Sequence, residues 1–226
     1  NDGVLTSSEA QVSITVNPEN DLPSATSQTL NTNEDTPVAI TLTASDVDGD
    51  ALTYSVGLVE NGVLSGTAPN LVFTPNANFT GSTVFSFTAN DGAGDSDPAT
   101  ISINVAPVND APTANANNVI VDEDASVAIT LTGSDIDGDT LTYSLTSNPA
   151  NGSLSGTPPN VTFTPNTNFN GSDSFAFTVN DGQLDSTEAV ISITVNPVND
   201  APVANSQNVT TNQEEAVSIT LTATDV

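Results

Sequence analysis

The acidic cluster 135–139 (Asp-Ile-Asp-Gly-Asp) and its repeat at 46–50 (Asp-Val-Asp-Gly-Asp) are the residues best suited to chemistry in this sequence. Each cluster holds three carboxylates, and the sequence contains no Lys, Arg or His that could pair with them. Hard divalent cations prefer oxygen ligands, and Ca²⁺ accepts six to eight of them in a flexible geometry. The clusters therefore predict calcium sites. The alternative is a solvated acidic turn, because Asp and Gly are also ordinary turn residues.

The clusters do not match the calcium loop of an EF-hand. That loop requires Gly at its sixth position and Glu at its twelfth. Counted from Asp135, these positions hold Thr140 and Thr146. We therefore expect a calcium site here to take its remaining ligands from other acidic loops.

The composition excludes several classes of function. The 226 residues carry 28 acidic side chains and no basic ones, for a formal net charge of −28. That charge excludes nucleic acid and anionic membranes as partners, and no apolar stretch approaches the ~20 residues of a membrane span. Without Cys, His, Lys or Arg, the chain lacks thiolate nucleophiles, Schiff-base lysines, imidazole bases and cationic clamps, so a catalytic site would have to consist of carboxylates, hydroxyls and amides. We predict no enzymatic activity, although a glycosidase with paired carboxylates remains chemically possible.

The sequence is an internal repeat with offsets of 89 and 90 residues. Asn-Asp-Gly begins at Asn1, Asn90 and Asn180, and Phe-Thr-Pro-Asn begins at Phe73 and Phe163. We predict the C-terminal strand of one unit (1–19), two complete units (20–109 and 110–199) and the N-terminal strands of another (200–226). On this interpretation, we expect the chain to be a window from a longer polymer that continues on both sides. The alternative is that a neighbouring copy donates the strands that the two end fragments lack.

Apolar and polar residues alternate within each unit, which is the pattern of half-buried β-strands. In the second complete unit we predict strands at 117–121, 126–133, 140–146, 152–155, 160–164, 173–179 and 188–196. Turn dipeptides such as Asn151-Gly152 separate them. Seven short strands in about ninety residues predict an all-β fold of tandem seven-stranded Greek-key sandwiches, immunoglobulin-like and arranged end to end. All Phe and Tyr residues occur in register in both units, so we expect them in the cores.

Strand order places most acids at the two ends of each sandwich. Successive strands run in opposite directions, so the loops with Asp135 and Asp181 lie where the chain enters, and the loop with Glu123 lies where it leaves. The groups expected to meet between the complete units are Glu34, Asp35, Asn109, Asp110, Asp135, Asp137, Asp139 and Asp181. Like charges ~5 Å apart repel by roughly 3 kcal/mol per pair at an effective dielectric near 20, so we expect calcium there.

Short motifs in both units resemble, in combination, the cadherin repeat in its bacterial form. They are Glu34, Ser45-Asp46-Val47-Asp48, Leu52-Thr53-Tyr54-Ser55, Thr88-Ala89-Asn90-Asp91-Gly92 and Val108-Asn109-Asp110-Ala111-Pro112. Such tandem units occur in large surface adhesins and secreted proteins, and the resemblance implies Ca²⁺ bound between domains. The sequence departs from the family at 73–81 and 163–171, where Asn stands in place of an acidic motif, and in the linker, which lacks a second Asn.

The predicted calcium ligands combine the resemblance with the repeated acidic clusters. They are Glu34, Asp35, Asp46, Asp48, Asp50, Asp91, Asn109, Asp110, Glu123, Asp135, Asp137, Asp139, Asp181, Asn199, Asp200 and Asp225. Position 213, aligned with Glu34 and Glu123, is Gln. We therefore expect the junction before 200–226 to bind calcium more weakly than the junction at Asn109.

These features predict a calcium-rigidified spacer or stalk in a long extracellular or cell-surface bacterial protein, such as an adhesin or filament. The expected partners are calcium ions, neighbouring repeats and, in a filament, other copies of the chain. Two alternatives remain open from the sequence. One is a self-assembling filament or surface-layer subunit, and the other is a carbohydrate-binding accessory module of a secreted hydrolase.

Overall fold

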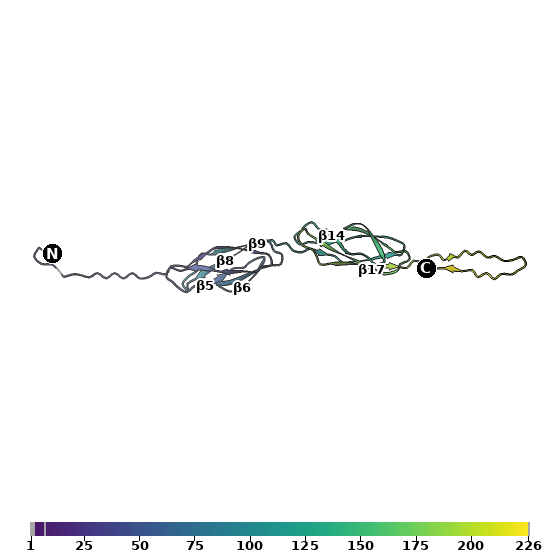
Figure 1. The fold of residues 1–226 in the computed structure, drawn as a ribbon. Helices are drawn as coiled ribbons and strands as arrows, with labels where there is room; N and C mark the ends of the chain where they lie inside the picture. Colours follow the sequence, from purple (N-terminus) through teal and green to yellow (C-terminus); the bar gives the residue numbers. More distant parts are fainter. Residues whose placement is uncertain (1–2, 7, 226) are drawn as a thin grey trace. The chain divides into compact units, whose positions relative to one another are not determined.

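The computed structural model describes residues 3–6 and 8–225, so the first copy of the repeated motif, at Asn1-Asp2, lies outside the described residues. The chain divides into two compact units, Asn1–Val108 and Asn109–Val226, which follow one another in colour from purple to yellow in Figure 1. All regular elements in the described residues are β-strands. No helix in that part of the chain is long and apolar enough to cross a membrane.

The first unit contains a sandwich of two sheets. Its strands are β1 (Ser24–Thr26), β2 (Gln28–Asn33), β3 (Val38–Thr41), β4 (Thr43–Ser45), β5 (Thr53–Val56), β6 (Gly62–Thr67), β7 (Asn70–Pro75), β8 (Gly81–Asn90) and β9 (Ala99–Ala106). One sheet has the order β2-β9-β8-β5 and the other the order β3-β7-β6, while β1 pairs with β4. The first and last long strands, β2 and β9, run parallel, and all other pairs are antiparallel.

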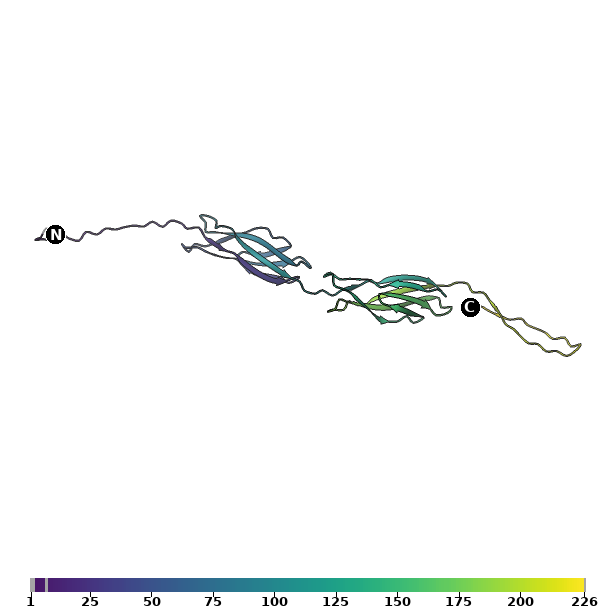
Figure 2. The same cartoon turned by 90° about the horizontal axis from the view of Figure 1, so that it is seen from above.

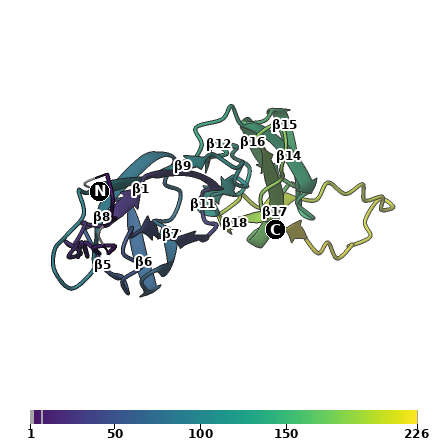
Figure 3. The ribbon, with the colours of Figure 1, turned by 90° about the vertical axis from the view of Figure 1, so that its left-hand side faces the viewer.

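The second unit repeats this topology. Its strands are β10 (Thr113–Ala114), β11 (Asn117–Asp122), β12 (Val127–Thr130), β13 (Gly133–Ser134), β14 (Thr142–Ser147), β15 (Gly152–Thr157), β16 (Asn160–Pro165), β17 (Gly171–Asn180) and β18 (Ala189–Asn196). The sheets have the orders β11-β18-β17-β14 and β12-β16-β15, and Figure 3 labels strands of both layers. The predicted all-β architecture of tandem sandwiches is confirmed.

The first strand of each unit passes from one sheet to the other, which the sequence did not predict. In the second unit, β10 pairs antiparallel with β13, whereas β11 pairs in parallel with β18. The predicted single strand at 126–133 is also divided into β12 and β13. There the backbone N–H of Leu131 donates to Pro159 O at 2.8 Å, and Thr132 O accepts from Asn115 N at 2.9 Å. These bonds satisfy the backbone where the ladder is interrupted.

One inserted residue explains why the repeat offset changes from 89 to 90. Strand β5 ends at Val56, whereas the equivalent strand β14 continues to Ser147, with a register shift between Leu145 and Ser147. Different hydrogen bonds hold the loop after β5 in the first unit and the loop after β14 in the second. Thr83 Oγ1 donates to Glu60 O at 2.7 Å in the first. In the second, Asp173 accepts from Ala150 N at 3.0 Å and Asn151 N at 2.7 Å.

The repeated aromatic residues form the cores, as predicted. The buried ones are Phe73, Phe85 and Phe87 in the first unit and Phe163, Phe175 and Phe177 in the second. Phe79, Phe169, Tyr54 and Tyr143 are partly buried against them. Burying one such side chain contributes about 1.5–3 kcal/mol, so these aromatic residues are major contributors to the stability of each unit.

The described residues before the first sandwich and after the second are mostly exposed. Residues 8–19 contain no strand. Toward the C-terminus, β19 (Val203–Ala204) pairs antiparallel with β20 (Ala223–Thr224), in the register of β10 with β13. Figure 2 shows the two sides of this hairpin next to each other in yellow. Its side chains lie mostly at the surface, because the described part of the hairpin has no second sheet to cover it.

Candidate metal sites

The two acidic clusters fold into matching loops. In each unit, carboxylate oxygens of Asp46, Asp48 and Asp50, or of Asp135, Asp137 and Asp139, lie within 4.8 Å of one another. A hydrogen bond closes each loop, from Asp50 N to Asp46 Oδ1 at 3.1 Å and from Asp139 N to Asp135 Oδ1 at 3.2 Å. The intervening glycine has a φ of 81° in both loops, a left-handed conformation that Gly adopts without steric cost.

A carboxylate oxygen in each loop is buried without a partner. These atoms are Asp46 Oδ2 and Asp135 Oδ2, the only buried side-chain N or O atoms in the described residues that have no hydrogen bond. Burying an unpaired anionic oxygen is costly, and the sequence contains no basic side chain that could compensate for it. An all-oxygen donor set of this kind fits a hard divalent cation such as Ca²⁺.

Asp91 and Asp181 occupy the same position in the hairpin loop between the last two strands. Asp181 Oδ1 accepts hydrogen bonds from Gln183 N at 2.6 Å and Leu184 N at 2.7 Å. The N–H of Leu184, with Asn109 and Gln183, lowers the pKa of Asp181 below its usual value. The side chain of Asn20, with the N–H groups of Gly94 and Ala93, does the same to the pKa of Asp91. Both groups are therefore held as carboxylates.

In each unit, the segment that enters the sandwich is hydrogen-bonded to these loops. In the second unit, Asn109 Nδ2 donates to Asp181 Oδ2, and Asp110 N donates to Asp137 Oδ2, both at 2.8 Å. Gln183 Nε2 adds a bond to Asn109 Oδ1 at 2.7 Å. Two predicted site residues, Asp137 and Asp181, thus contact the linker residues Asn109 and Asp110 at the entry end of one sandwich.

The first unit repeats this arrangement with two residues that the prediction omitted. Asn20 Nδ2 donates to Asp91 Oδ2 at 2.9 Å, and Asp21 N donates to Asp48 Oδ2 at 2.8 Å. Their recurrence as the linker pair Asn109-Asp110 is the sequence signal that could have identified them. Gln183 was also omitted, and no pattern in the sequence indicated its contact.

A buried glutamate marks the exit end of each unit. Glu34 is 4% exposed and accepts the N–H of Val108 at 2.6 Å, and Glu123 is 6% exposed and accepts the N–H of Val198 at 2.6 Å. The neighbouring Asp35 accepts from Asn78 N at 3.2 Å. Each glutamate thus accepts a hydrogen bond from the backbone of the segment that leaves its own sandwich.

A hollow of about 370 Å³ lies at the exit end of the second unit. Its lining includes Glu123, Asn170, Asn199 and Asp200. Asn170 Nδ2 donates a long hydrogen bond of 3.5 Å to Glu123 Oε2. Predicted ligands from the loop and from the departing chain therefore share one cavity. Asp225 is exposed directly after β20, apart from any cluster found in the described residues.

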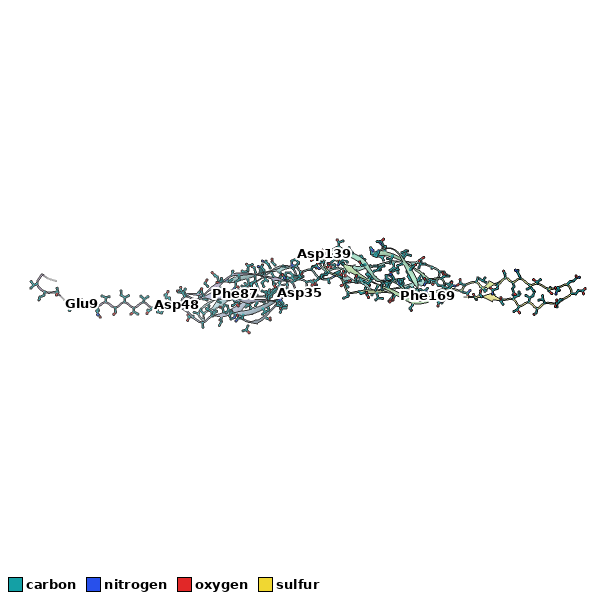
Figure 4. All side chains as sticks on the ribbon, viewed as in Figure 1. Glu9, Asp35, Asp48, Phe87, Asp139 and Phe169 are labelled. Atoms are coloured by element: carbon teal, nitrogen blue, oxygen red, sulfur yellow. The ribbon has the colours of Figure 1, made fainter. Side chains whose placement is uncertain are left out.

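Within each unit, acids gather at the ends and apolar groups lie between them. Figure 4 shows Asp48 at one end of the first sandwich and Asp35 at the other, with Phe87 between them. The acidic ends are therefore separate from the apolar core.

Comparisons with known proteins agree with this architecture. Human CDH23 EC21-23 is similar over 91% of this chain and 80% of its own length, with 16% sequence identity and a TM-score of 0.55. Human Protocadherin-24 EC1-2 matches 80% of this chain and 100% of its own length, with 14% identity and a TM-score of 0.48. The likeness to CDH23 shows that the cadherin fold is shared.

Part of an enzyme chain is also similar in sequence. The endo-fucoidan hydrolase MfFcnA4 from glycoside hydrolase family 107 matches 81% of this chain with 25% identity and a TM-score of 0.36. The present chain spans 30% of the length of that enzyme. A search among curated proteins finds no match.

The family assignment rests on both complete repeats. One family model, described as bacterial Ig domain, matches twice, and each match covers one sandwich with its long strands, its acidic loop and its entry linker. The two matches span residues 20–104 and 109–194, and the chain therefore belongs to the bacterial Ig domain family as a tandem of two domains.

Proposed function

We propose that this chain is a calcium-stiffened spacer in a long extracellular or cell-surface protein. The observation that carries the proposal is the pair of buried, unpartnered oxygens, Asp46 Oδ2 and Asp135 Oδ2, each inside a cluster of carboxylates. Bacterial Ig-like domains are typical of secreted and surface proteins, and extracellular modules commonly use calcium at millimolar concentrations.

The proposed ligands lie at both ends of each sandwich. At the entry end they are the three Asp of the acidic loop, the Asp of the last hairpin loop and the linker Asn-Asp. At the exit end they are Glu34 with Asp35, or Glu123 with Asn199 and Asp200. Bound calcium would supply the positive charge that this sequence lacks. The carboxylates hold the loops and the linker in the arrangement that receives it.

The residues on either side of the boundary between the units are each hydrogen-bonded within their own unit. Val108 N–H is bonded to Glu34 of the first unit, and the next residue, Asn109, is bonded to Asp181 of the second. Consecutive residues are therefore anchored to different domains. Each anchor ends on a carboxylate, so cations that hold these carboxylates would also stiffen the linker.

Small-angle X-ray scattering of the full chain tests the proposal. We expect the maximum dimension and the flexibility to differ between millimolar calcium and a chelator, while amide exchange shows that β8, β9, β17 and β18 stay protected in both. The double variant Asp46→Asn/Asp135→Asn should lose most of the response. Identical scattering in calcium and chelator would contradict the proposal. Loss of all strand protection in chelator would instead show that metal is needed for folding.

The adhesin and filament versions of this role differ in their partners. A filament subunit should show concentration-dependent lateral association of the full chain in calcium, measured by sedimentation. A spacer should remain monomeric. A carbohydrate-binding role predicts retention on immobilised glycans that survives chelation.

A further inference from the structure

The exit end of the second unit carries a reactive dipeptide that its counterpart in the first unit lacks. Gly171 is the first residue of β17 and is paired with Val195 of β18, while Asn170 lies in the loop before it; the equivalent residues of the first unit are Thr80-Gly81. Asn170 is exposed at the rim of the hollow, and its amide contacts Glu123 Oε2 at 3.5 Å. A change at this one side chain would alter the charge of the hollow.

We propose that Asn170 is a site of spontaneous deamidation that regulates cation binding in this hollow. The Gly171 backbone nitrogen attacks Asn170 Cγ, the new N–Cγ bond closes a succinimide ring, and the Cγ–Nδ2 bond breaks. The amide leaves as ammonia with the proton of the Gly171 N–H. Water then opens the ring at Cγ, which yields aspartate, or at the main-chain carbonyl, which yields isoaspartate. The net reaction consumes one water and releases one ammonia.

The structure favours Asn170 over the other two Asn-Gly pairs in the sequence. Asn61-Gly62 and Asn151-Gly152 are held in place, because Asn61 O accepts from Asn76 N at 2.9 Å and Asn151 O accepts from Asn166 N at 2.8 Å. Ring closure requires the backbone to rotate, which these bonds oppose.

Packing around the glycines separates the three pairs further. A Cβ on Gly152 would collide with the Phe163 ring, and one on Gly62 would collide with the Phe73 ring. Around Gly171 the nearest atom to such a Cβ is Phe169 Cζ at 3.7 Å. A tightly packed backbone resists displacement, so Gly171 has more room to move toward its neighbour's side chain.

The consequence of deamidation rests on the proposed calcium function. The aspartate product places a new carboxylate beside Glu123, in a hollow that already contains Asp200. Without calcium the added charge repels its neighbours and destabilises this end of the unit. With calcium it adds a ligand, and calcium affinity rises with the number of charged ligands.

Peptide mapping by mass spectrometry of the full chain, aged in mildly alkaline buffer, tests the modification. We expect conversion at Asn170 to be at least about tenfold faster than at Asn61 or Asn151. The variant Asn170→Thr, which copies the first unit, should remove the fast conversion. Equal rates at the three asparagines, or no conversion at Asn170, would overturn the proposal.

Calcium titration of Asn170→Asp tests the regulatory consequence separately. We expect the calcium affinity at this end of the unit to be about tenfold higher in the variant. In chelator, we expect the backbone amides of β17 and β18 to exchange faster in the variant than in the parent chain. Asn151→Asp adds the same charge outside the hollow and should leave the affinity unchanged. Unchanged affinity in Asn170→Asp, where the parent chain binds calcium, would refute regulation. Fast conversion in a chain that binds no calcium would support the modification and contradict the proposed function.

Discussion

Replacing Asp135 with Asn removes the unpartnered oxygen of one acidic loop and leaves the loop's structure intact. The amide oxygen of Asn can still accept the hydrogen bond that Asp139 N gives to Asp135 Oδ1. The new NH₂ group can donate to a neighbouring carboxylate. The substitution therefore tests the charge of the site separately from its geometry.

The expected effect in chelator is stabilisation. Asp135 lies within 4.8 Å of the carboxylates of Asp137 and Asp139. Each pair repels by about 3.5 kcal/mol at an effective dielectric near 20 and by about 1 kcal/mol in bulk water. Both neighbours are exposed, so solvent screening favours the lower figure. Asp135→Asn should raise the free energy of unfolding of the second unit by about 1–2 kcal/mol.

The expected effect in calcium is the loss of part of the stabilisation by the ion. At a free concentration one hundred times the dissociation constant, one bound ligand stabilises the folded state by about 2.7 kcal/mol. If the lost carboxylate weakens binding tenfold, that figure falls to about 1.4 kcal/mol. The stability difference between calcium and chelator should therefore shrink by about half in the variant.

Amide exchange on the full chain measures this difference for each unit. Peptides from β17 and β18 report on the second unit, while β8 and β9 in the first unit serve as an internal reference. Glu188→Gln is the matched control, since it removes one charge from the same unit outside both acidic clusters. If Asp135→Asn and Glu188→Gln respond equally to calcium, the assignment of Asp135 as a ligand is wrong.

Three further predictions concern the core and two of the candidate ligands. Phe163→Ala should destabilise the second unit by about 3–5 kcal/mol through loss of a buried ring, seen as faster exchange in β17 with β8 unchanged. Because hydrogen bonds lower the pKa of Asp181, its contribution to stability should be complete above the ordinary Asp value of about 3.9. That contribution should disappear as the pH falls through the lowered value, and carboxyl NMR titration in chelator should show a midpoint below 3.9. Glu123→Gln, which copies Gln213, should weaken calcium binding at the exit end of the second unit, and isothermal titration showing unchanged affinity would refute the ligand alignment.

Hydrophobic period and turn residues were sufficient to predict the sandwiches. Alternation such as Phe175, Phe177 and Val179 identifies which face of a strand is buried, and the in-register Phe residues identify the core. Alternation does not identify which strand is the neighbour. The passage of the first strand between sheets, at β10 and β11, depends on pairings with residues far along the chain, and no local pattern encodes those pairings.

For the candidate sites, strand direction predicted which acidic loops lie at the same end of a sandwich. Direction places Asp181 beside the entering chain, and the structure gives it a bond to Asn109. Direction says nothing about individual amide contacts, so Gln183 was missed. The fastening of a loop by Asp173 was missed for the same reason, because it depends on two backbone N–H groups that an inserted residue repositions.

The parallel pairing of the first and last long strands has a mechanical consequence. Strand β2 is aligned with β9 over six register pairs, and β11 with β18 over six. When a chain is pulled at its two ends, tension reaches each domain through these two strands and slides them past each other. The ladder between them is then sheared, so its hydrogen bonds share the tension and must fail together, whereas a hairpin opened from its end peels one bond at a time. A domain built in this way resists extension most strongly along the direction in which the chain itself is drawn.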